Sequence, residues 1–333
     1  MICAALTTLA GTGCSASAET RTASPLSLPA VIALARAGDM IRLAPGVYEG
    51  VRISPRRYEQ PLILDARQAT LIGVRVTGVS GLSIQGGTFR LPEPRQNEQS
   101  GKFDFGSALR MRQVTRVKVS GATFVGPGTG EAVAEPRYGE GYGLVVDEGG
   151  EVEVSDSAFR GLKAGVILRR IEGFRVVGNR FQEMRSDGVQ VAESRKGLIE
   201  ANTCRGTRIR DKEHPDCIQL WSRPPSPPTS DIVIRRNRAD GHTQGIGMFN
   251  HVREGVDDGG YDRIVIEDND IAISLPQGIA LSAGRDSIVR NNRVRTLSDA
   301  RHRAGINVSS EVLRCGNFIA AGAGKPGVKE KPC

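Results

Sequence analysis

The chain has 333 residues, a formal net charge of +8 and a hydrophobic fraction of 39%. These values, with both charge signs mixed along the chain, argue against an intrinsically disordered protein. No apolar run reaches the ~18 residues that a membrane-spanning helix needs, so we expect no transmembrane segment. The length suffices for a single domain with a sizeable core.

The positive net charge predicts a polyanionic partner. Aromatic residues make up only 5% of the chain, and the basic residues form no contiguous block, which disfavours nucleic acid. We therefore expect an acidic polysaccharide as the partner, no nucleic acid, and a monomeric protein.

The first 18 residues have the character of an export signal. They contain no charged residue and end in Ala16, Ser17 and Ala18, the small-x-small pattern that a signal peptidase cuts. A lipid anchor on Cys14 is the alternative. We expect a periplasmic or secreted protein whose domain spans residues 19–333.

Cleavage after Ala18 would leave four cysteines, which can form two disulfides in an oxidising compartment. We favour the local pairs Cys204–Cys217 and Cys315–Cys333, since each would tie down a loop or a terminus. Buried free thiols are the alternative.

A five-residue pattern recurs eight times along the chain. Its second and fourth residues are aliphatic or Met, while most third and fifth residues are not, which is typical of a strand with one buried face. The copies lie at residues 108–112, 143–147, 165–169, 188–192, 217–221, 245–249, 278–282 and 305–309.

A second column of residues follows these copies at a constant register. It consists of Ser157, Asn179, Asn202, Asn237, Asn269, Asn292 and Asn317. Identical side chains stacked at strand spacing can bond one another, and Asn tolerates a left-handed turn conformation. Two residues further on comes a mostly apolar column that begins with Phe89, Phe124, Phe159 and Phe181. This register predicts an all-β fold, a right-handed parallel β-helix in which each turn stacks on the previous one.

Residues 29–37 predict a short helix that ends at Gly38 and leads into a strand-like segment at 40–48. Such a helix would cover the open end of the coil. This opening resembles that of the pectate-lyase-like superfamily. The resemblance implies a β-helix that acts on acidic polysaccharides, in a superfamily that includes lyases, hydrolases, epimerases, esterases and phage tailspikes.

In a stacked coil, outward residues at one strand position form rows about 4.8 Å apart. We expect a sugar-binding track where amides, a carboxylate pair and two aromatic rings converge on neighbouring turns; simple solvation of a polar face is the alternative. Asp187 and Asp216 stand just before their strands, and the predicted substrate-binding residues are Gln190, Gln219, Gln244, Trp221, Phe249 and Arg169.

Three long connections, at residues 203–216, 222–231 and 250–262, predict a binding wall beside this track. His214, His242 and His251 lie on three adjacent connections, and we include them in the predicted site. A solvated charged loop is the alternative reading of the first connection.

The sequence also resembles the polygalacturonase family, whose fold carries Asp residues before consecutive strands. The resemblance covers residues 186–188, 216–218 and 245–246. It implies hydrolysis by paired carboxyl groups. Pro215, however, stands where that family has its acid, and Gln244 replaces its His, so we disfavour this reaction.

β-Elimination from a uronic acid needs a base, positive charge near the carboxylate, and a proton donor for the leaving oxygen. We predict His214 as the base. Cations at Arg210 and Lys212, helped by Arg208, Arg223 and Arg253, would neutralise the substrate carboxylate.

Asp187 and Asp216, with Gln190 and Gln219, form a candidate oxygen cage for Ca²⁺. Asp257 and Asp258 are a second, weaker calcium candidate. We therefore predict a polysaccharide lyase, and C5 epimerisation, hydrolysis and non-catalytic polysaccharide binding stay open as alternatives.

Overall fold

The computed structural model describes residues 17–333 except 97, 99, 128–138, 209–212, 224–226, 250–251, 254–255, 258 and 321–325. The predicted signal segment and Cys14 thus lie almost wholly outside the described residues, as do Arg210, Lys212 and His251. No helix in the described part of the chain is long and apolar enough to cross a membrane.

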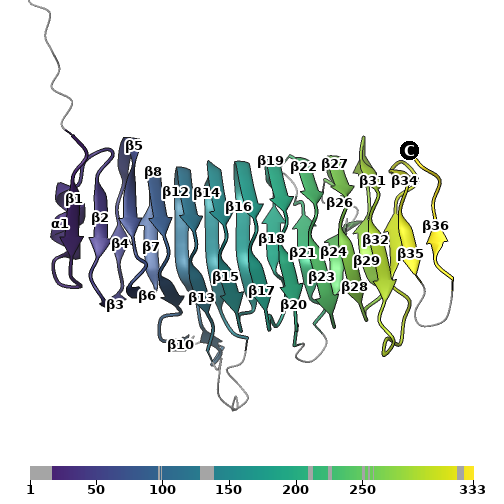
Figure 1. The fold of residues 1–333 in the computed structure, drawn as a ribbon, viewed down its shortest axis with the longest axis horizontal. Helices are drawn as coiled ribbons and strands as arrows, with labels where there is room; N and C mark the ends of the chain where they lie inside the picture. The colour runs from purple at the N-terminus through teal and green to yellow at the C-terminus, as the bar shows by residue number, and fades with distance from the viewer. Residues whose placement is uncertain are drawn as a thin grey trace, which may run out of the picture.

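The strands wind into one continuous coil whose turns follow one another in chain order from the N-terminus to the C-terminus (Figure 1). Each full turn contributes three strand segments, which we call the first, second and third columns. The first column carries the recurring pattern and consists of β4 (Arg52–Ile53), β7 (Val74–Thr77), the first halves of β12 (Ser107–Ser120), β14 (Tyr142–Ser155) and β16 (Ala164–Val177), then β18 (Val189–Ala192), β21 (Asp216–Trp221), β24 (Gln244–Met248), β29 (Gln277–Leu281) and β33 (Gly305–Val308).

The second column completes the larger sheet. It consists of β1 (Thr20–Ala23), β2 (Met40–Leu43), β5 (Arg56–Asp65), β8 (Val79–Gln85), the second halves of β12, β14 and β16, β19 (Arg195–Glu200), β22 (Thr229–Arg235), β27 (Tyr261–Glu267), β30 (Gly284–Arg285), β31 (Ile288–Arg290) and β34 (Leu313–Cys315).

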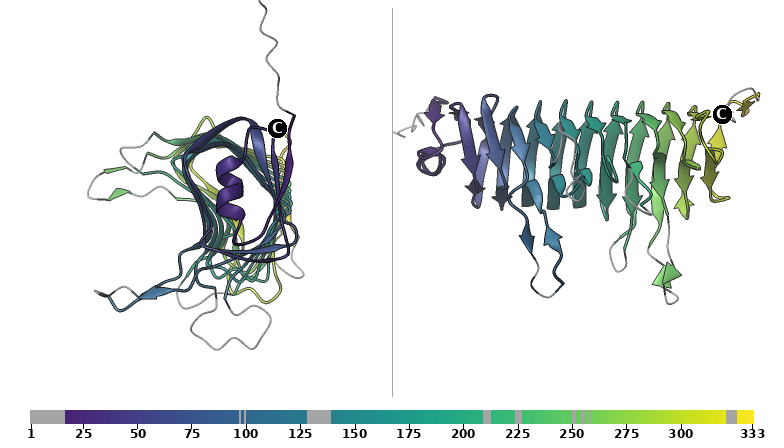
Figure 2. Two further views of the ribbon diagram at one scale, coloured as in Figure 1. Left: turned by 90° about the vertical axis from the view of Figure 1, so that its left-hand side faces the viewer. Right: turned by 90° about the horizontal axis from the view of Figure 1, so that it is seen from below.

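The third column is a separate sheet. Its strands are β3 (Gly46–Glu49), β6 (Ala69–Ile72), β9 (Thr88–Arg90), β13 (Thr123–Val125), β15 (Ala158–Arg160), β17 (Arg180–Gln182), β20 (Thr203–Arg205), β23 (Arg238–Gly241), β28 (Asp270–Ile273), β32 (Arg293–Thr296), β35 (Phe318–Ala320) and β36 (Val328–Lys329). Two hairpins, β10 (Arg95–Gln96) with β11 (Phe103–Asp104) and β25 (Val252–Arg253) with β26 (Val256–Asp257), project from the coil (Figure 2).

The predicted register is confirmed strand by strand. The second residues of the eight pattern copies pair in parallel from Leu109 to Ile306, and the third residues pair from Arg110 to Asn307. A further copy at residues 73–77, which the sequence pattern also contains, pairs with β12 through Val74 and Arg75. Residues distant in the chain therefore lie side by side, as the fold prediction requires.

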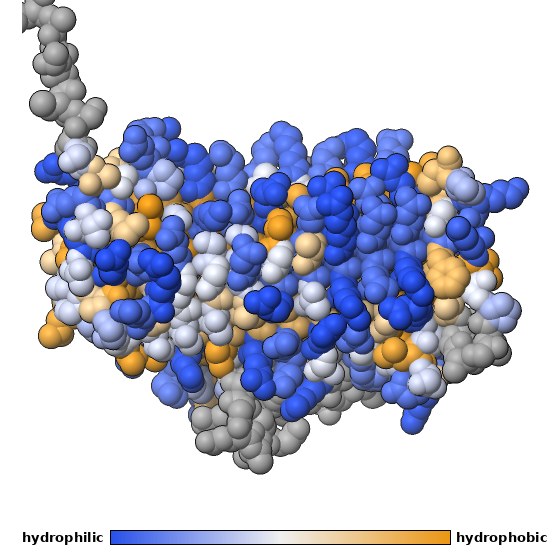
Figure 3. Space-filling model, viewed as in Figure 1, coloured by the Kyte–Doolittle hydropathy of each residue, from blue (hydrophilic) through white to orange (hydrophobic). Residues whose placement is uncertain are grey.

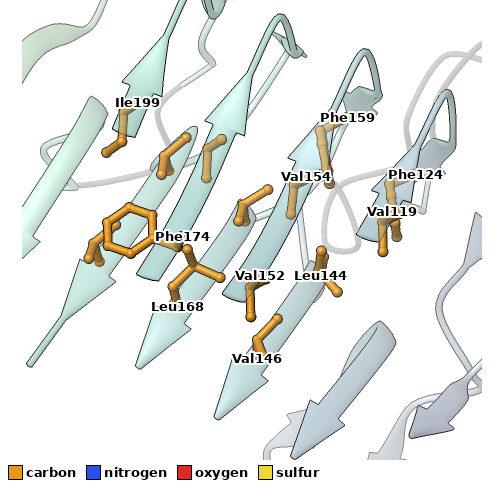
Figure 4. Packing of buried hydrophobic residues seen from close by; sticks show 14 of the residues in the cluster. Val119, Phe124, Leu144, Val146, Val152, Val154, Phe159, Leu168, Phe174 and Ile199 are labelled. Carbon is orange, nitrogen blue, oxygen red and sulfur yellow. The ribbon is translucent and has the colours of Figure 1, made fainter. Parts of the chain in front are cut away.

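The core fills the inside of the coil. Phe89, Phe124, Phe159 and Phe181 are stacked, with ring centroids 4.5–5.0 Å apart. Figure 4 shows Phe124 and Phe159 among buried aliphatic side chains of the neighbouring columns. The face of the molecule seen in Figure 3 is mostly hydrophilic, with small separate apolar patches.

The N-terminal helix confirms the predicted cap. α1 (Leu28–Leu34) lies across the open end of the coil (Figure 2), with Leu28 buried and Val31 and Ile32 packed against the core. The helix ends at Leu34, earlier than expected, because the backbone of Ala35 is already extended. Gly38 instead provides a left-handed turn with a φ of 82°.

The two favoured disulfides, Cys204–Cys217 and Cys315–Cys333, are both present. The first joins the third column to the start of β21 and so constrains the chain directly beside Asp216. The second ties the C-terminal residue to β34. Both pairs are typical of proteins folded in an oxidising compartment.

A buried ladder of amides joins the predicted Asn column. Each Nδ2 donates to the Oδ1 of the next Asn, at 2.9–3.0 Å, from Asn179 to Asn317. The expectation that these Asn residues are left-handed is wrong. The residue before each ladder position has that conformation, with φ values of 52–68° from Asp156 to Gly316. The bend therefore sits one residue earlier, and the Asn side chain is left free to bond inside the coil.

We predict that Asn237→Ala lowers the free energy of unfolding by about 2–4 kcal/mol. Asn237 accepts from the backbone N–H of Asn202 at 2.9 Å and donates to the carbonyl of Ile199 at 2.9 Å, so both groups would be buried without a partner. Chemical denaturation measures the change. Asn307→Ala is the control, since Asn307 is exposed and bonds only Gln277; equal losses in both variants would contradict a structural role for the ladder.

Candidate functional site

The structure brings Asp187 and Asp216 together on consecutive turns. Asp187 is 2% exposed and Asp216 is fully buried, and the backbone N–H of Asp216 donates to Asp187 Oδ1 at 2.8 Å. Burial raises the pKa of Asp187. Burial, and then the charge of Asp187, raise the pKa of Asp216 well above its usual range. The arrangement therefore favours a protonated Asp216.

Two amides fix the orientation of these carboxyl groups. The Gln190 amide nitrogen donates to Asp187 Oδ2, and the Gln219 amide nitrogen donates to Asp216 Oδ2 at 3.1 Å. Both oxygens of Asp187 are thus occupied. Asp216 Oδ1 is buried and has no hydrogen-bond partner among the described residues, so it is the one oxygen of the pair left unsatisfied there.

These contacts do not fit the predicted calcium cage. The amide nitrogens of Gln190 and Gln219, rather than their oxygens, face the carboxyl groups, and three of the four carboxyl oxygens already accept hydrogen bonds. A Ca²⁺ ion takes 6–8 oxygen ligands. The described residues also contain no group of three or more His, Cys, Asp or Glu arranged to hold a metal. The second calcium candidate includes Asp258, which lies outside those residues.

Gly247 packs tightly against the carboxyl group of Asp216. Gly247 follows Gln219 in the row of third residues, and a Cβ atom there would lie 2.5 Å from Asp216 Oδ1. The same atom would lie 3.1 Å from the ring of Phe249. The carboxyl group of Asp216 is therefore packed against Gly247 near Phe249, where no larger side chain fits without displacing it, and the sequence analysis did not identify this glycine.

Of the three predicted histidines, only His214 is described beside the pair. Its Nδ1 lies 4.0 Å from Asp216 Oδ2, and its side chain is 68% exposed. His242 is directed to the next turn instead, with its Nδ1 2.7 Å from the Ser274 hydroxyl. His251 lies outside the described residues. A shared histidine cluster is thus not formed by His214 and His242.

The predicted sugar platform is only partly formed. Trp221 is half-buried, but the guanidinium of Arg223 lies over its ring at 4.2 Å. No ring contact joins Trp221 and Phe249, although both belong to the described chain. Trp221 Nε1, Gln244 Oε1 and Asp216 Oδ1 are buried and find no hydrogen-bond partner within the described parts of the chain. Three such atoms on adjacent turns mark a region suited to a polar ligand.

Other charged residues at the site are engaged with protein groups. Arg169 forms a salt bridge with Asp147 at 2.5 Å, so its charge is partly neutralised. Arg208 lies 3.7 Å from Glu183. Of Arg253, the structure describes the backbone only.

An ion-pair cluster holds the connection that carries His214. Arg185 is 6% exposed and contacts Glu140 and Glu213, the latter at 3.1 Å. Glu213 directly precedes His214. The cluster therefore links the segment before β14 to the segment before β21, and no periodic pattern in the sequence indicated it.

A side chain at residue 247 should displace the carboxyl group of Asp216. We predict that Gly247→Ala lowers any activity that uses this group at least about 100-fold, since its Cβ would lie 2.5 Å from Asp216 Oδ1. Gly305→Ala is the control, because a Cβ there meets nothing closer than 3.9 Å. Unchanged kcat/KM in a folded Gly247→Ala protein would show that the activity does not use this carboxyl group.

Comparison with known proteins supports the architecture. The family model described as "Right handed beta helix region" matches residues 107–256, and no curated protein matches the sequence. The protein has a right-handed parallel β-helix fold.

Solved structures with the same fold differ in function. The Dettilon tailspike protein aligns over 88% of this chain with a TM-score of 0.58 and 14% identity. The pectate lyase Pel9A aligns over 91% of this chain and 80% of its own, with a TM-score of 0.58 and 12% identity. PfbA, a surface adhesin of Streptococcus pneumoniae, aligns over 89% of this chain and 83% of its own, with a TM-score of 0.57 and 11% identity. The present chain spans 56% of the tailspike chain.

Proposed function

We propose that the protein is an exported enzyme that cleaves a uronic-acid-containing polysaccharide by β-elimination. The observation that carries the proposal is the asymmetry of the carboxyl pair. Asp187 is fully engaged, while Asp216 keeps one free oxygen beside the only described histidine of the site. The two disulfides support export.

His214 is the proposed base. Because its Nδ1 is the nitrogen nearer to Asp216, its Nε2 is left to take the proton beside the substrate carboxylate. The electrons of that C–H bond form the carbon–carbon double bond, the bond to the glycosidic oxygen breaks, and that oxygen takes up a proton. The exposed position of His214 suits a polymer that approaches from solvent.

Asp216 is proposed to stabilise the negative charge that develops on the substrate carboxylate. A carboxylic acid kept neutral by burial can donate a hydrogen bond to such an enolate. The raised pKa of Asp216 and its free Oδ1 support this role. Arg210 and Lys212, on the same connection as His214, stay the proposed cations for the carboxylate.

Hydrolysis is the second candidate, because two adjacent buried carboxyl groups are what it requires. It needs an oxygen on each group that is open to the substrate or water, and Asp187 has none. C5 epimerisation would use the same base and acid without breaking the glycosidic bond. A binding protein without catalytic activity is the remaining alternative.

Incubation with polygalacturonate, alginate and chondroitin sulfate distinguishes these reactions. We expect the ultraviolet absorbance of an unsaturated product with at least one of them. Reducing ends without that absorbance would establish hydrolysis. Proton exchange from heavy water without cleavage would establish epimerisation, and binding without any product would contradict catalysis.

A further inference from the structure

Arginines extend the first column of the coil toward the N-terminus. Arg52 pairs in register with Arg75, and Arg75 pairs with Arg110, on consecutive turns. Residues at one register position project from the same face, about 4.8 Å apart. The row continues through Val145 and Ile167, which are buried with Tyr142 packed against them, to Gln190 and Gln219. The arginines and the carboxyl pair therefore lie at one register position, on either side of a covered stretch.

A fourth arginine joins this group from the hairpin. Burial, and then the positive charges of Arg110, Arg52 and Arg95, lower the pKa of Arg75, with only Asp104 acting in the opposite direction. The positive charges of Arg52, Arg95 and Arg110 therefore act together on Arg75. We call Arg52, Arg75, Arg95 and Arg110 the arginine cluster.

Arg75 is held in a fixed orientation at the centre of the cluster. Its Nη1 donates to the carbonyls of Val74 and Ser107, at 3.0 and 3.1 Å. Its Nε and Nη2 donate no hydrogen bond within the described part of the chain. A half-buried guanidinium with unused donors is prepared to bind an anion.

Three of the four arginines of the cluster have no ion pair within the described part of the chain. Elsewhere, arginines on neighbouring turns pair with carboxylates, as in Arg263–Asp231, Arg285–Asp262 and Arg290–Glu267. In the cluster only Arg110 does so, with Asp147 at 2.8 Å, and the described residues offer Arg52, Arg75 and Arg95 no ion pair. Like charges gathered without counter-ions raise the free energy of the protein, and a bound polyanion would lower it.

We propose that the arginine cluster binds the acidic groups of a polysaccharide strand that runs along the coil from the Asp187–Asp216 site. The inference rests on the proposed function, since it extends the same face. Arg110 is three turns from Gln190, or about 14 Å, and Arg52 is five turns away, or about 24 Å. Only a chain of several sugar units can therefore occupy the site and the cluster together.

The test is a binding measurement in a His214→Ala background that prevents turnover. Isothermal titration of polygalacturonate, alginate and chondroitin sulfate compares the parent with Arg52→Gln/Arg95→Gln. These two positions are exposed and make no described ion pair, so the variant should fold. Arg90→Gln is the matched control, because Arg90 is also exposed and lies on the turn of Arg75 but in the third column.

We expect the double variant to bind the preferred polyanion roughly 10- to 100-fold more weakly, with a smaller dependence on salt, while Arg90→Gln is unchanged. Equal weakening by Arg90→Gln, or no weakening by the double variant, would overturn the proposal. Failure of the parent to bind any of the three polyanions would overturn it as well.

The proposed function fails on a different result. If polyanion binding depends on the arginine cluster but the wild-type protein forms no product, the proposed role of the cluster is supported and the proposed lyase activity is contradicted. In an active enzyme, the double variant should raise KM for the polymer and leave kcat/KM for a trisaccharide unchanged. If the double variant lowers kcat/KM for the trisaccharide as strongly as for the polymer, the cluster acts at the reacting sugar unit. That result would overturn the proposal that a long strand extends to the cluster.

Discussion

Asp216→Asn is expected to unfold at a higher temperature than the wild type at pH 8, and at the same temperature near pH 4. Burial and Asp187 raise the pKa of Asp216 in the folded protein, whereas the unfolded chain has an ordinary pKa. The folded state therefore loses stability as pH rises from the unfolded pKa through the folded one. Asn does not ionise, so it escapes this loss. We expect a gain of about 0.5–2 kcal/mol at pH 8, or roughly 1–6 °C.

The activities of variants at Asp216 distinguish two mechanisms. If Asp216 donates a hydrogen bond, Asn can replace it in part, and kcat should fall about 10-fold in Asp216→Asn and 100- to 1,000-fold in Asp216→Ala. If Asp216 transfers a proton as the acid of a hydrolase, both variants should be equally inactive. Scanning calorimetry and initial rates on the preferred polymer provide the two measurements.

Asp147→Asn is the control for the stability effect. Asp147 is also buried, but it accepts hydrogen bonds from Arg110 and Arg169. Its neutralisation removes two ion pairs, so we expect lower stability at pH 8. An increase in both variants, or a decrease in Asp216→Asn, would contradict the assignment of Asp216 as a carboxyl group destabilised for function.

His214→Ala is expected to lower kcat by about 100- to 10,000-fold, because no other described histidine lies beside Asp216. The side chain is exposed, so imidazole added to the solution can reach the space that it leaves. We predict partial recovery of the unsaturated product as the imidazole concentration rises. This recovery would distinguish a lost base from a disturbed fold.

His242→Ala is the matched control. His242 is exposed and bonds Ser274 on the following turn rather than the carboxyl pair, so its removal should change kcat less than about threefold. Equal losses in the two variants, or no recovery of His214→Ala with imidazole, would contradict His214 as the base.

The sequence alone determined the coil and its register. The alternation of apolar residues, the Asn column and the Phe column each repeat once per turn, and a side chain that repeats in this way can stack only if the turns lie in register. Both disulfides were predicted on a different ground, since each local pair ties down a loop or a terminus. The register also placed Asp187 near Asp216, because both precede pattern strands on consecutive turns.

Only the tertiary structure decided what these residues can do. The sequence allowed Gln190 and Gln219 to offer oxygens to calcium, but their amide nitrogens are used to hold the carboxyl groups. The sequence predicted that the ring of Trp221 would be open to a sugar, whereas the guanidinium of Arg223 lies over this ring. The periodic pattern fixes the position of a residue along the coil and the face that it occupies. The side-chain torsions, burial and neighbouring charges that set a hydrogen bond or a pKa depend on contacts between turns and connections, which have no period.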